Sequence, residues 1–353
     1  MESIESASIR EPRSGNEDRA ATPAPSRAIG PHHVLACLDR SALAENVVPH
    51  AVALARRCGA RMTLLHVIEP GHGAGAATDP LDWEVRRAEA RQYLEGIAAR
   101  SPDVPVEIVI GEGHAAQQIG AWAARHHVDC TVLSTHGEGG HTEEALASTA
   151  HRLVCGSVGS VLLVPASSGL PPSVREARYA RIVVPLDGSM RAESVVPLAV
   201  RLATAHRAEL ILVHVVPAPQ LTCIEPLAPE DQQLGEQIVR RNERVARRYL
   251  ERLQARLQAS ELSVRTVLIA EGEVRAELAS AIEREGADLV VMSAHGSTGR
   301  TEWSCGSVAA HLMAHCTRPL LLIHERPRNG TKQRGAQAGH EAVATRMPAL
   351  TSA

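Results

Sequence analysis

Short apolar runs recur along the chain at intervals that suit strands alternating with helices. In the second half these runs cover about residues 181–186, 210–216, 264–269, 289–292 and 320–323. In the first half they cover about residues 34–38, 62–68, 106–110, 131–133 and 161–164. Runs this short, continuous and rich in β-branched residues are typical of strands buried on both faces. They predict five strands in each half.

Stretches with helical periodicity separate the apolar runs. In the second half they cover residues 193–205, 232–259, 274–285 and 307–315. Alternation of strands and helices predicts crossover units, and therefore a doubly wound parallel α/β sheet in each half. Such sheets bind ligands at the carboxyl ends of their strands, so we expect a site in the loops there.

The two halves are copies of one unit. The segment beginning at Ser41 matches the segment beginning at Ser189 almost residue for residue, and His66 matches His214. We therefore predict a tail (1–30), a first domain (31–165), a linker (166–178), a second domain (179–325) and a second tail (326–353). The last strand of each copy should lie at a sheet edge, and unpaired edges need covering. This predicts that the copies pack together as a pseudo-dimer.

Composition narrows the function classes. The formal net charge of the 353 residues is −3 and there is no Phe. Neither bulk charge nor aromatic stacking therefore favours nucleic acid, and charge gives no attraction to an anionic membrane. Seven Cys without a C-x-x-C pair indicate free thiols in a reducing cytoplasm. No apolar stretch is long enough for a membrane span, and the first residues lack a signal peptide.

A glycine turn follows the fourth strand of each copy. In the second copy Ser293 and Gly296 are followed, nine residues later, by Gly306-Ser307. Glycine lets the chain turn close to a ligand, and a helix start presents N–H groups to a phosphate. We expect Ser307 to cap that helix, with Arg300 in the loop above it. The alternative is an ordinary loop between a strand and a helix.

The first copy carries the same loop in altered form. Ser134 and Gly137 are followed by Ala147-Ser148, and the acidic residues Glu138, Glu143 and Glu144 lie between them. Carboxylates would repel a phosphate, and Ala147 adds a Cβ where Gly306 has none. The second copy is therefore the better candidate for binding an anion.

Other polar residues give weaker signals. Asp187 ends the first strand of the second copy. Its carboxylate could accept a hydrogen bond from a ribose hydroxyl or hold a metal. Alternatively, it could cap the next helix. His66 and His214 fall within strands and are interpreted as hydrogen-bonded core residues. His311 and His315 have metal-compatible spacing but are interpreted as surface residues, so no metal site is predicted. No set of catalytic residues is predicted, and the arginines of residues 232–259 should form a solvated face.

These features resemble the universal stress protein family in a tandem form. Its nucleotide signature, Gly-x2-Gly-x9-Gly-Ser/Thr, is approached by Ser293-x2-Gly296-x9-Gly306-Ser307. The resemblance implies two five-stranded sheets of order 3-2-1-4-5, an adenine-nucleotide alpha-hydrolase-like fold. It also implies dimer contacts at the last strand and ATP as ligand, which Mg²⁺ can accompany. The implied ATP contacts are Pro185, Asp187, Val215, Met292, Ser293, Gly296, Gly306, Ser307 and Val308.

Three functions remain open at this stage. The first is a cytoplasmic stress-response regulator that binds ATP or a related adenine nucleotide, mainly in the second domain. The second is an interaction module that keeps the fold without a nucleotide, acting through a homo-dimer or a protein partner. The third is a weak ATPase, which the sequence supports least, since no Walker-type G-x4-G-K-S/T loop occurs.

Overall fold

The computed structural model describes residues 30–69, 80–135, 149–156, 159–166, 176–219, 229–258, 262–296 and 305–324. The predicted tails and most of the predicted linker lie outside these residues. So do Arg300, Gly137, Ala147, Ser148 and the three glutamates of the first glycine loop.

Each copy contributes five strands. Those of the first copy are β1 (His33–Cys37), β2 (Arg61–Ile68), β3 (Val106–Glu112), β4 (Cys130–Ser134) and β5 (Ser160–Val164). Those of the second are β6 (Arg181–Pro185), β7 (Glu209–Pro217), β8 (Val264–Gly272), β9 (Leu289–Ser293) and β10 (Leu320–Ile323). All ten predicted strands are present, with ends shifted by a few residues.

Helices fill the crossovers between strands. The first copy has α1 (Ala42–Glu45), α2 (Val47–Cys58), α3 (Pro80–Ala98), α4 (Ala115–Arg125) and α5 (Thr149–Gly156). The second has α6 (Met190–Glu193), α7 (Val196–His206), α8 (Pro229–Gln258), α9 (Val274–Arg284) and α10 (Ser307–His315). In the described part of the chain, no helix is both long enough and apolar enough to cross a membrane.

One predicted helix is in fact two. The pattern predicted a single helix over residues 193–205, but α6 ends at Glu193 and α7 begins at Val196. Pro197 occupies the first turn of α7. A proline has no N–H to bond the preceding turn, yet its fixed φ suits a helix start. The prediction of one continuous helix was therefore wrong at this point.

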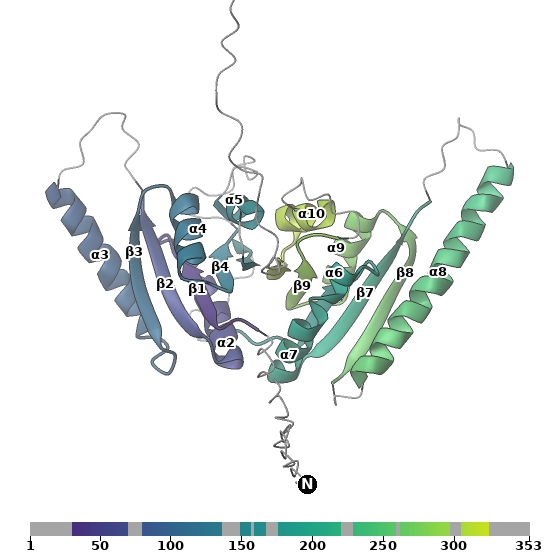
Figure 1. Ribbon diagram of the computed structural model, residues 1–353, viewed down its shortest axis with the longest axis horizontal. Coiled ribbons are helices and arrows are strands. Elements are labelled where there is room, and N and C mark those ends of the chain that lie inside the picture. Colours follow the sequence, from purple (N-terminus) through teal and green to yellow (C-terminus); the bar gives the residue numbers. More distant parts are fainter. Residues whose placement is uncertain are drawn as a thin grey trace, which may run out of the picture.

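The ten strands form one sheet in the order β3-β2-β1-β4-β5-β10-β9-β6-β7-β8. Within each copy all pairs are parallel. The strands of each copy follow the order 3-2-1-4-5, which confirms the predicted order. At the centre β10 runs antiparallel to β5, with Leu320 opposite Leu163 and Leu322 opposite Val161. Figure 1 shows the two halves side by side about this junction. The predicted pseudo-dimer is confirmed, and the pairing covers both exposed edges.

Both faces of the sheet carry a core. One face packs against α2, α3, α7 and α8 through residues such as Ala36, Leu94 and Leu250. The other packs against α4, α5, α9 and α10 through residues such as Leu35 and Leu312. Leu35 and Ala36 are neighbours in β1 and point to opposite faces, as alternating side chains must. Burial on both faces explains why the strands are apolar throughout.

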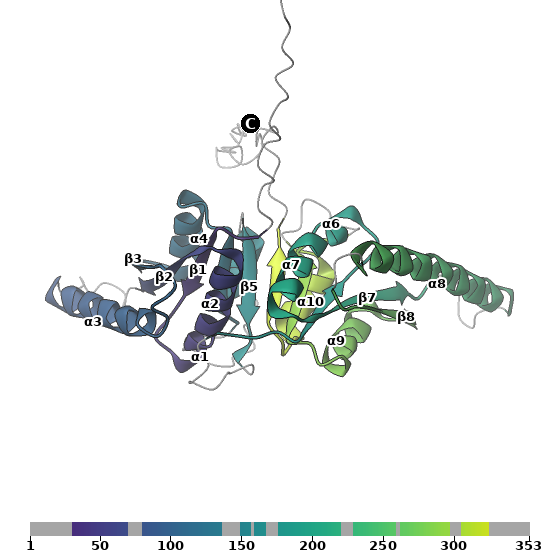
Figure 2. The same ribbon diagram turned by 90° about the horizontal axis from the view of Figure 1, so that it is seen from below.

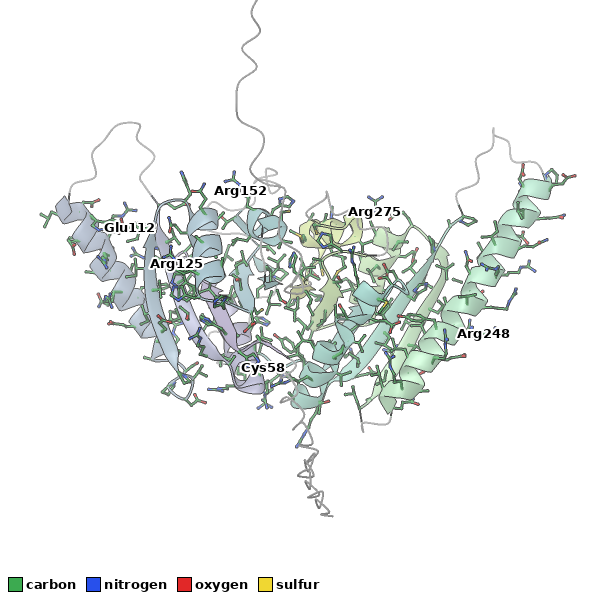
Figure 3. All side chains as sticks on the ribbon, in the orientation of Figure 1. Cys58, Glu112, Arg125, Arg152, Arg248 and Arg275 are labelled. Atoms are coloured by element: carbon green, nitrogen blue, oxygen red, sulfur yellow. The ribbon has the colours of Figure 1, made fainter. Side chains whose placement is uncertain are left out.

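Contacts beyond the sheet also join the copies. Seen from below, α2 and α7 lie on either side of β5 and β10 (Figure 2), and the Arg201 guanidinium donates to the Cys58 carbonyl oxygen at 3.1 Å. Glu176 forms ion pairs with Arg56 at 2.8 Å and Arg57 at 3.0 Å. At the outer end of the second copy the arginines of α8 are exposed, as predicted, and Arg248 points away from the sheet (Figure 3).

Candidate functional site

The largest cavity at the carboxyl ends of the second copy's strands has a volume of about 620 Å³. It lies over the ends of β6, β7 and β9 and the start of α10. All nine residues predicted from the sequence line it: Pro185, Asp187, Val215, Met292, Ser293, Gly296, Gly306, Ser307 and Val308. Parallel strands deliver their carboxyl ends to one edge, which brings together residues more than a hundred positions apart.

The turn after β6 sets the position of Asp187. One carboxylate oxygen, Oδ1, accepts a hydrogen bond from the Ser189 N–H at 2.9 Å. Ser189 in turn caps α6, since its hydroxyl oxygen accepts from the Ala192 N–H at 3.1 Å. The helix cap is therefore Ser189, and Asp187 orders the turn that precedes it. Asp187 itself remains exposed at the cavity.

Gly296 lies directly against this carboxylate. A Cβ built on Gly296 would be 2.7 Å from Asp187 Oδ2, closer than two such atoms can approach. A larger residue here would therefore push the Asp187 carboxylate or the loop aside. Gly296 allows the loop after β9 to close onto the turn after β6, and both then form one wall of the cavity.

Gly306 is the N-cap of α10. Its N–H donates to the Ala294 carbonyl oxygen at 2.8 Å, and a Cβ on it would lie 3.3 Å from that oxygen and 3.5 Å from the Gly296 nitrogen. Gly306 has no side chain with which to cap this helix. The expectation that Ser307 is the cap was wrong, because Ser307 is already helical and exposed while the extended residue before it is Gly306. The first-turn N–H groups of α10 consequently open onto the cavity.

Ser293 stands where the family signature has its first glycine. It is 8% exposed, and its Oγ accepts from the His295 N–H at 3.4 Å. The hydroxyl is thus held by its own turn while it lines the cavity. In the first copy the matching Ser134 Oγ is buried and has no hydrogen-bond partner among the described residues.

His214 is a neutral, structural member of the cavity wall. Its Nδ1 lies 2.7 Å from the Leu186 carbonyl oxygen. Burial lowers its pKa, and this bond and the Asp187 charge offset only part of that effect. His66 makes the matching contact to Leu38 at 2.8 Å in the first copy. The interpretation of both histidines as hydrogen-bonded core residues is confirmed.

A charged pair at the rim was missed by the sequence reasoning. Glu273 caps α9, because its Oε2 accepts from the Ala276 N–H at 2.8 Å, and its Oε1 accepts from the Arg275 guanidinium at 2.7 Å. Both side chains line the cavity, and Figure 3 shows Arg275 beside α9 and α10. They follow β8, whose carboxyl end lies at the same edge. The expected strand order already placed the end of β8 at this edge, and the charged pair could have been predicted from that.

The first copy has a smaller counterpart of about 170 Å³. It is lined by Asp39 and Ser134, with Cys37 in the place of Pro185. Asp39 Oδ1 accepts from both the N–H and the hydroxyl of Ser41, at 2.9 and 2.6 Å. A cavity of about 480 Å³ adjoins it and shares Ala115 and Thr149 with it. The two copies therefore share the strand-end turn, but the space at the strand ends is divided in the first copy and continuous in the second.

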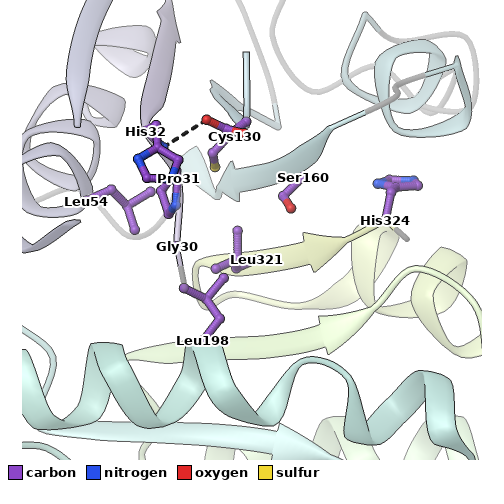
Figure 4. Close-up of a pocket in the computed structure, with 10 residues that line it drawn as sticks. Gly30, Pro31, His32, Leu54, Cys130, Ser160, Leu198, Leu321 and His324 are labelled. Carbon is purple, nitrogen blue, oxygen red and sulfur yellow. Dashed lines mark hydrogen bonds between the residues drawn. The ribbon is translucent and has the colours of Figure 1, made fainter. Parts of the chain in front are cut away.

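A further cavity of about 280 Å³ lies between the copies (Figure 4). Leu54 and Cys130 come from the first copy, and Leu198 and Leu321 from the second. Its carboxylate, Asp129, accepts from the His32 N–H at 2.8 Å. This cavity lies at the amino ends of the first copy's strands and contains no residue predicted for the site.

Metal ligands are not grouped in the described part of the chain. There, no three His, Cys, Asp or Glu side chains are placed to hold an ion. His311 and His315 stack at 4.4 Å between ring centroids, and His315 Nδ1 lies 2.9 Å from the His311 carbonyl oxygen.

Comparisons with known proteins agree with the repeat and the fold. The chain matches the sequence profile of the universal stress protein family over residues 31–165 and 178–324. A universal stress protein of Methanocaldococcus jannaschii is 23% identical over 154 residues, which are 41% of this chain and 94% of that protein. A universal stress protein structure from Archaeoglobus fulgidus aligns with a TM-score of 0.58 and 14% identity, over 83% of this chain and 96% of that one. A functionally unknown protein from Pseudomonas aeruginosa aligns with a TM-score of 0.57 and 15% identity, over 84% and 93%.

Proposed function

Since this chain belongs to the universal stress protein family, with two copies of the family's domain in tandem, we propose that it binds ATP or a related adenine nucleotide in the cavity of the second copy. We further propose that it acts there as a regulatory protein of the cytoplasm in a stress response. The nucleotide would report on the energy state of the cell, and the protein would pass on that state through its conformation or its contacts.

One observation carries this proposal. The start of α10, capped by Gly306, opens into a 620 Å³ cavity that the Asp187 carboxylate also lines, next to Gly296. Uncapped helix-start N–H groups carry partial positive charge and suit phosphate oxygens. A carboxylate on the same cavity suits a ribose hydroxyl or a cation carried by the phosphates.

The remaining wall suits an adenine base. Val215 and Met292 are 7% exposed and line the cavity beside the buried Pro185. An apolar surface with a few placed polar groups is the usual composition of a small-molecule site. In this assignment Ser307 and Val308 offer backbone N–H groups to the phosphates, and Asp187 orients the sugar. The residues present therefore fit the nucleotide that the family signature implies.

The first copy is the poorer candidate. Its strand ends line two adjoining cavities of about 170 and 480 Å³ rather than one continuous cavity. The sequence of its glycine loop also contains Glu138, Glu143 and Glu144, whose charges oppose phosphate. We propose that this copy supports the second through the shared sheet rather than through a nucleotide of its own.

The polar groups at the second site favour binding over hydrolysis. His214 Nδ1 is held by the Leu186 carbonyl, and Asp187 holds the turn to Ser189. Both side chains are thus used to shape the cavity. We therefore propose a regulator rather than an enzyme, and phosphate release above the background rate, lost in Asp187→Ala, would show otherwise.

Titration calorimetry of the full chain with ATP tests the proposal. We expect about one ATP per chain, no binding by Gly306→Glu, and unchanged binding by the matched variant Ala147→Glu. Circular dichroism melts of both variants control for folding. Binding that survives Gly306→Glu but is lost in Ala147→Glu would place the site in the first copy. No binding at millimolar ATP would favour the interaction module.

A further inference from the structure

Two cysteines from different copies lie beside the junction of β5 and β10. Cys155 lies in the last turn of α5, and Cys305 lies directly before Gly306, the cap of α10. Because β5 and β10 are antiparallel, α5 and α10 run in opposite directions on the same face of the sheet (Figure 1). The end of α5 and the start of α10 therefore lie beside the same part of the junction.

Individual contacts connect the two positions step by step. Leu322 pairs with Val161, so His324 and Gly159 follow at the next matching places across the junction. The rings of His324 and His295 are 6.2 Å apart. Beside His295, the Ala294 carbonyl oxygen accepts from the Cys305 thiol at 3.6 Å. Cys155 is only four positions before Gly159 in the chain.

Their mutual influence is consistent with this placement. Burial raises the pKa of the Cys305 thiol to about 11, and the next contribution in the same direction comes from Cys155. An effect of one thiol on the other requires that they lie near each other.

A histidine that can act as a base lies next to the Cys155 thiol. Its Sγ lies 3.7 Å from His151 Nε2 and 3.9 Å from Nδ1. Cys155 and Cys305 are both partly exposed, whereas Cys37, Cys58 and Cys130 are buried. Exposure and a nearby imidazole are the features that distinguish reactive thiols from structural ones.

We propose that Cys155 and Cys305 form a peroxide-sensitive pair that closes into a disulfide between the two copies. The oxidant is a hydroperoxide, and the site is one of covalent modification.

The chemistry proceeds in two balanced steps. His151 takes the Cys155 proton, and the thiolate sulfur attacks one peroxide oxygen, so that the O–O bond breaks and water leaves with that proton. Cys155 is then a sulfenic acid. The Cys305 sulfur attacks the Cys155 sulfur, the S–O bond breaks, and the departing hydroxide takes the Cys305 proton as a second water. The peroxide is reduced by two electrons and the two thiols are oxidised to one disulfide.

Closure should affect the neighbouring cavity. Cys305 is bonded to Gly306, whose N–H holds Ala294 and whose Cα lies close to Gly296. Movement of Cys305 towards α5 would displace Gly306 and, with it, its contacts to Ala294 and Gly296. Oxidation should therefore weaken nucleotide binding, a consequence that rests on the proposed function.

Mass spectrometry of the full chain tests the pair. The reduced protein is treated with hydrogen peroxide, blocked with N-ethylmaleimide and digested with trypsin. We expect a linked peptide joining Cys155 to the segment that contains Cys305, absent from Cys155→Ser and Cys305→Ser. No Lys or Arg separates Cys305 from Cys316, so Cys316→Ser is the matched control and should keep the link.

Each result has a definite meaning. Absence of the linked peptide in wild type, or its loss in Cys316→Ser, would overturn the thiol pair. Melting curves of the reduced variants control for folding. ATP titration of reduced and oxidised protein is a separate readout. If neither form binds ATP, the proposed function fails while the peptide result still decides the disulfide.

Discussion

His50 of the first copy and Tyr179 of the second are joined by a hydrogen bond, with His50 Nδ1 2.8 Å from the Tyr179 hydroxyl oxygen. The rings stack with centroids 5.8 Å apart, and the ring of His206 approaches Tyr179 at 4.7 Å. His50 and Tyr179 are 3% and 2% exposed. A neutral aromatic cluster is thus buried between α2 and α7, and it links the copies on the helix face opposite the two glycine loops.

This cluster makes the protein sensitive to acid. Burial lowers the pKa of His50 to about 4, from the 6.5 that is usual for a histidine. The folded state therefore binds the proton more weakly than the unfolded chain, and protonation favours unfolding. Stability from this group is complete above pH 6.5 and is lost as the pH falls towards 4. Burial lowers the pKa of His206 as well, so it acts in the same direction.

We expect the free energy of unfolding to fall between pH 6.5 and 4, and to fall less in His50→Gln. Glutamine can still hydrogen-bond the Tyr179 hydroxyl but does not titrate. Urea unfolding at several pH values measures the difference between wild type and variant. Arg57, Glu176 and Arg178 act on His206 in both proteins, so they cancel in this comparison. Parallel pH curves for the two proteins would contradict the prediction.

Gly296→Ala should weaken ATP binding several-fold. The added methyl would lie 2.7 Å from Asp187 Oδ2, so the carboxylate or the loop must move. Because Asp187 Oδ1 is held by the Ser189 N–H, moving the carboxylate would cost about 1 kcal/mol, which is several-fold in affinity. Calorimetric titration measures it. Gly96→Ala is the control, since nothing lies within 4 Å of that position in α3; equal affinities of the two variants would argue against the assigned cavity.

Ser293→Gly should bind ATP several-fold more tightly than wild type. The substitution restores the first glycine of the family signature and removes a hydroxyl that lines the cavity. Loss of the bond to the His295 N–H, which is 3.4 Å long, should cost about 1 kcal/mol of stability at most. Ser134→Gly changes the matching residue of the first copy and should leave ATP affinity unchanged. If Ser293→Gly weakens binding, the hydroxyl is a ligand rather than an obstruction.

Removal of the tails should leave the melting temperature nearly unchanged. Residues 1–28 and 328–353 lack the apolar periodicity that a buried segment needs. Differential scanning calorimetry of the truncated and full-length proteins checks this. A drop of many degrees after either deletion would show that a tail packs on the domains.

The local pattern of residues was sufficient to predict much of the structure. Apolar runs specified the ten strands because strands buried on both faces must be apolar throughout. The spacing from Gly296 to Gly306 indicated the loop and the start of α10, since glycine positions reflect backbone constraints that act over a few residues. The resemblance to the family also predicted nine contact residues, and all nine line one cavity.

Other features depended on which strands lie side by side. Glu273 and Arg275 reach the cavity rim only because β8 ends at the same edge as β6 and β9. The split between α6 and α7 followed from Pro197 in a stretch whose periodicity looks continuous.

The sequence by itself determined the repeat, the fold class and the glycine loops, because these depend on burial and backbone freedom within short segments. Only the tertiary structure decided the closeness of Asp187 to Gly296, the bond from His50 to Tyr179 and the placement of α5 and α10 beside one junction. Each of these joins residues far apart in the chain. Their proximity follows from sheet order and from the antiparallel pairing of β5 with β10, and a periodicity of two or 3.6 residues carries no information about either.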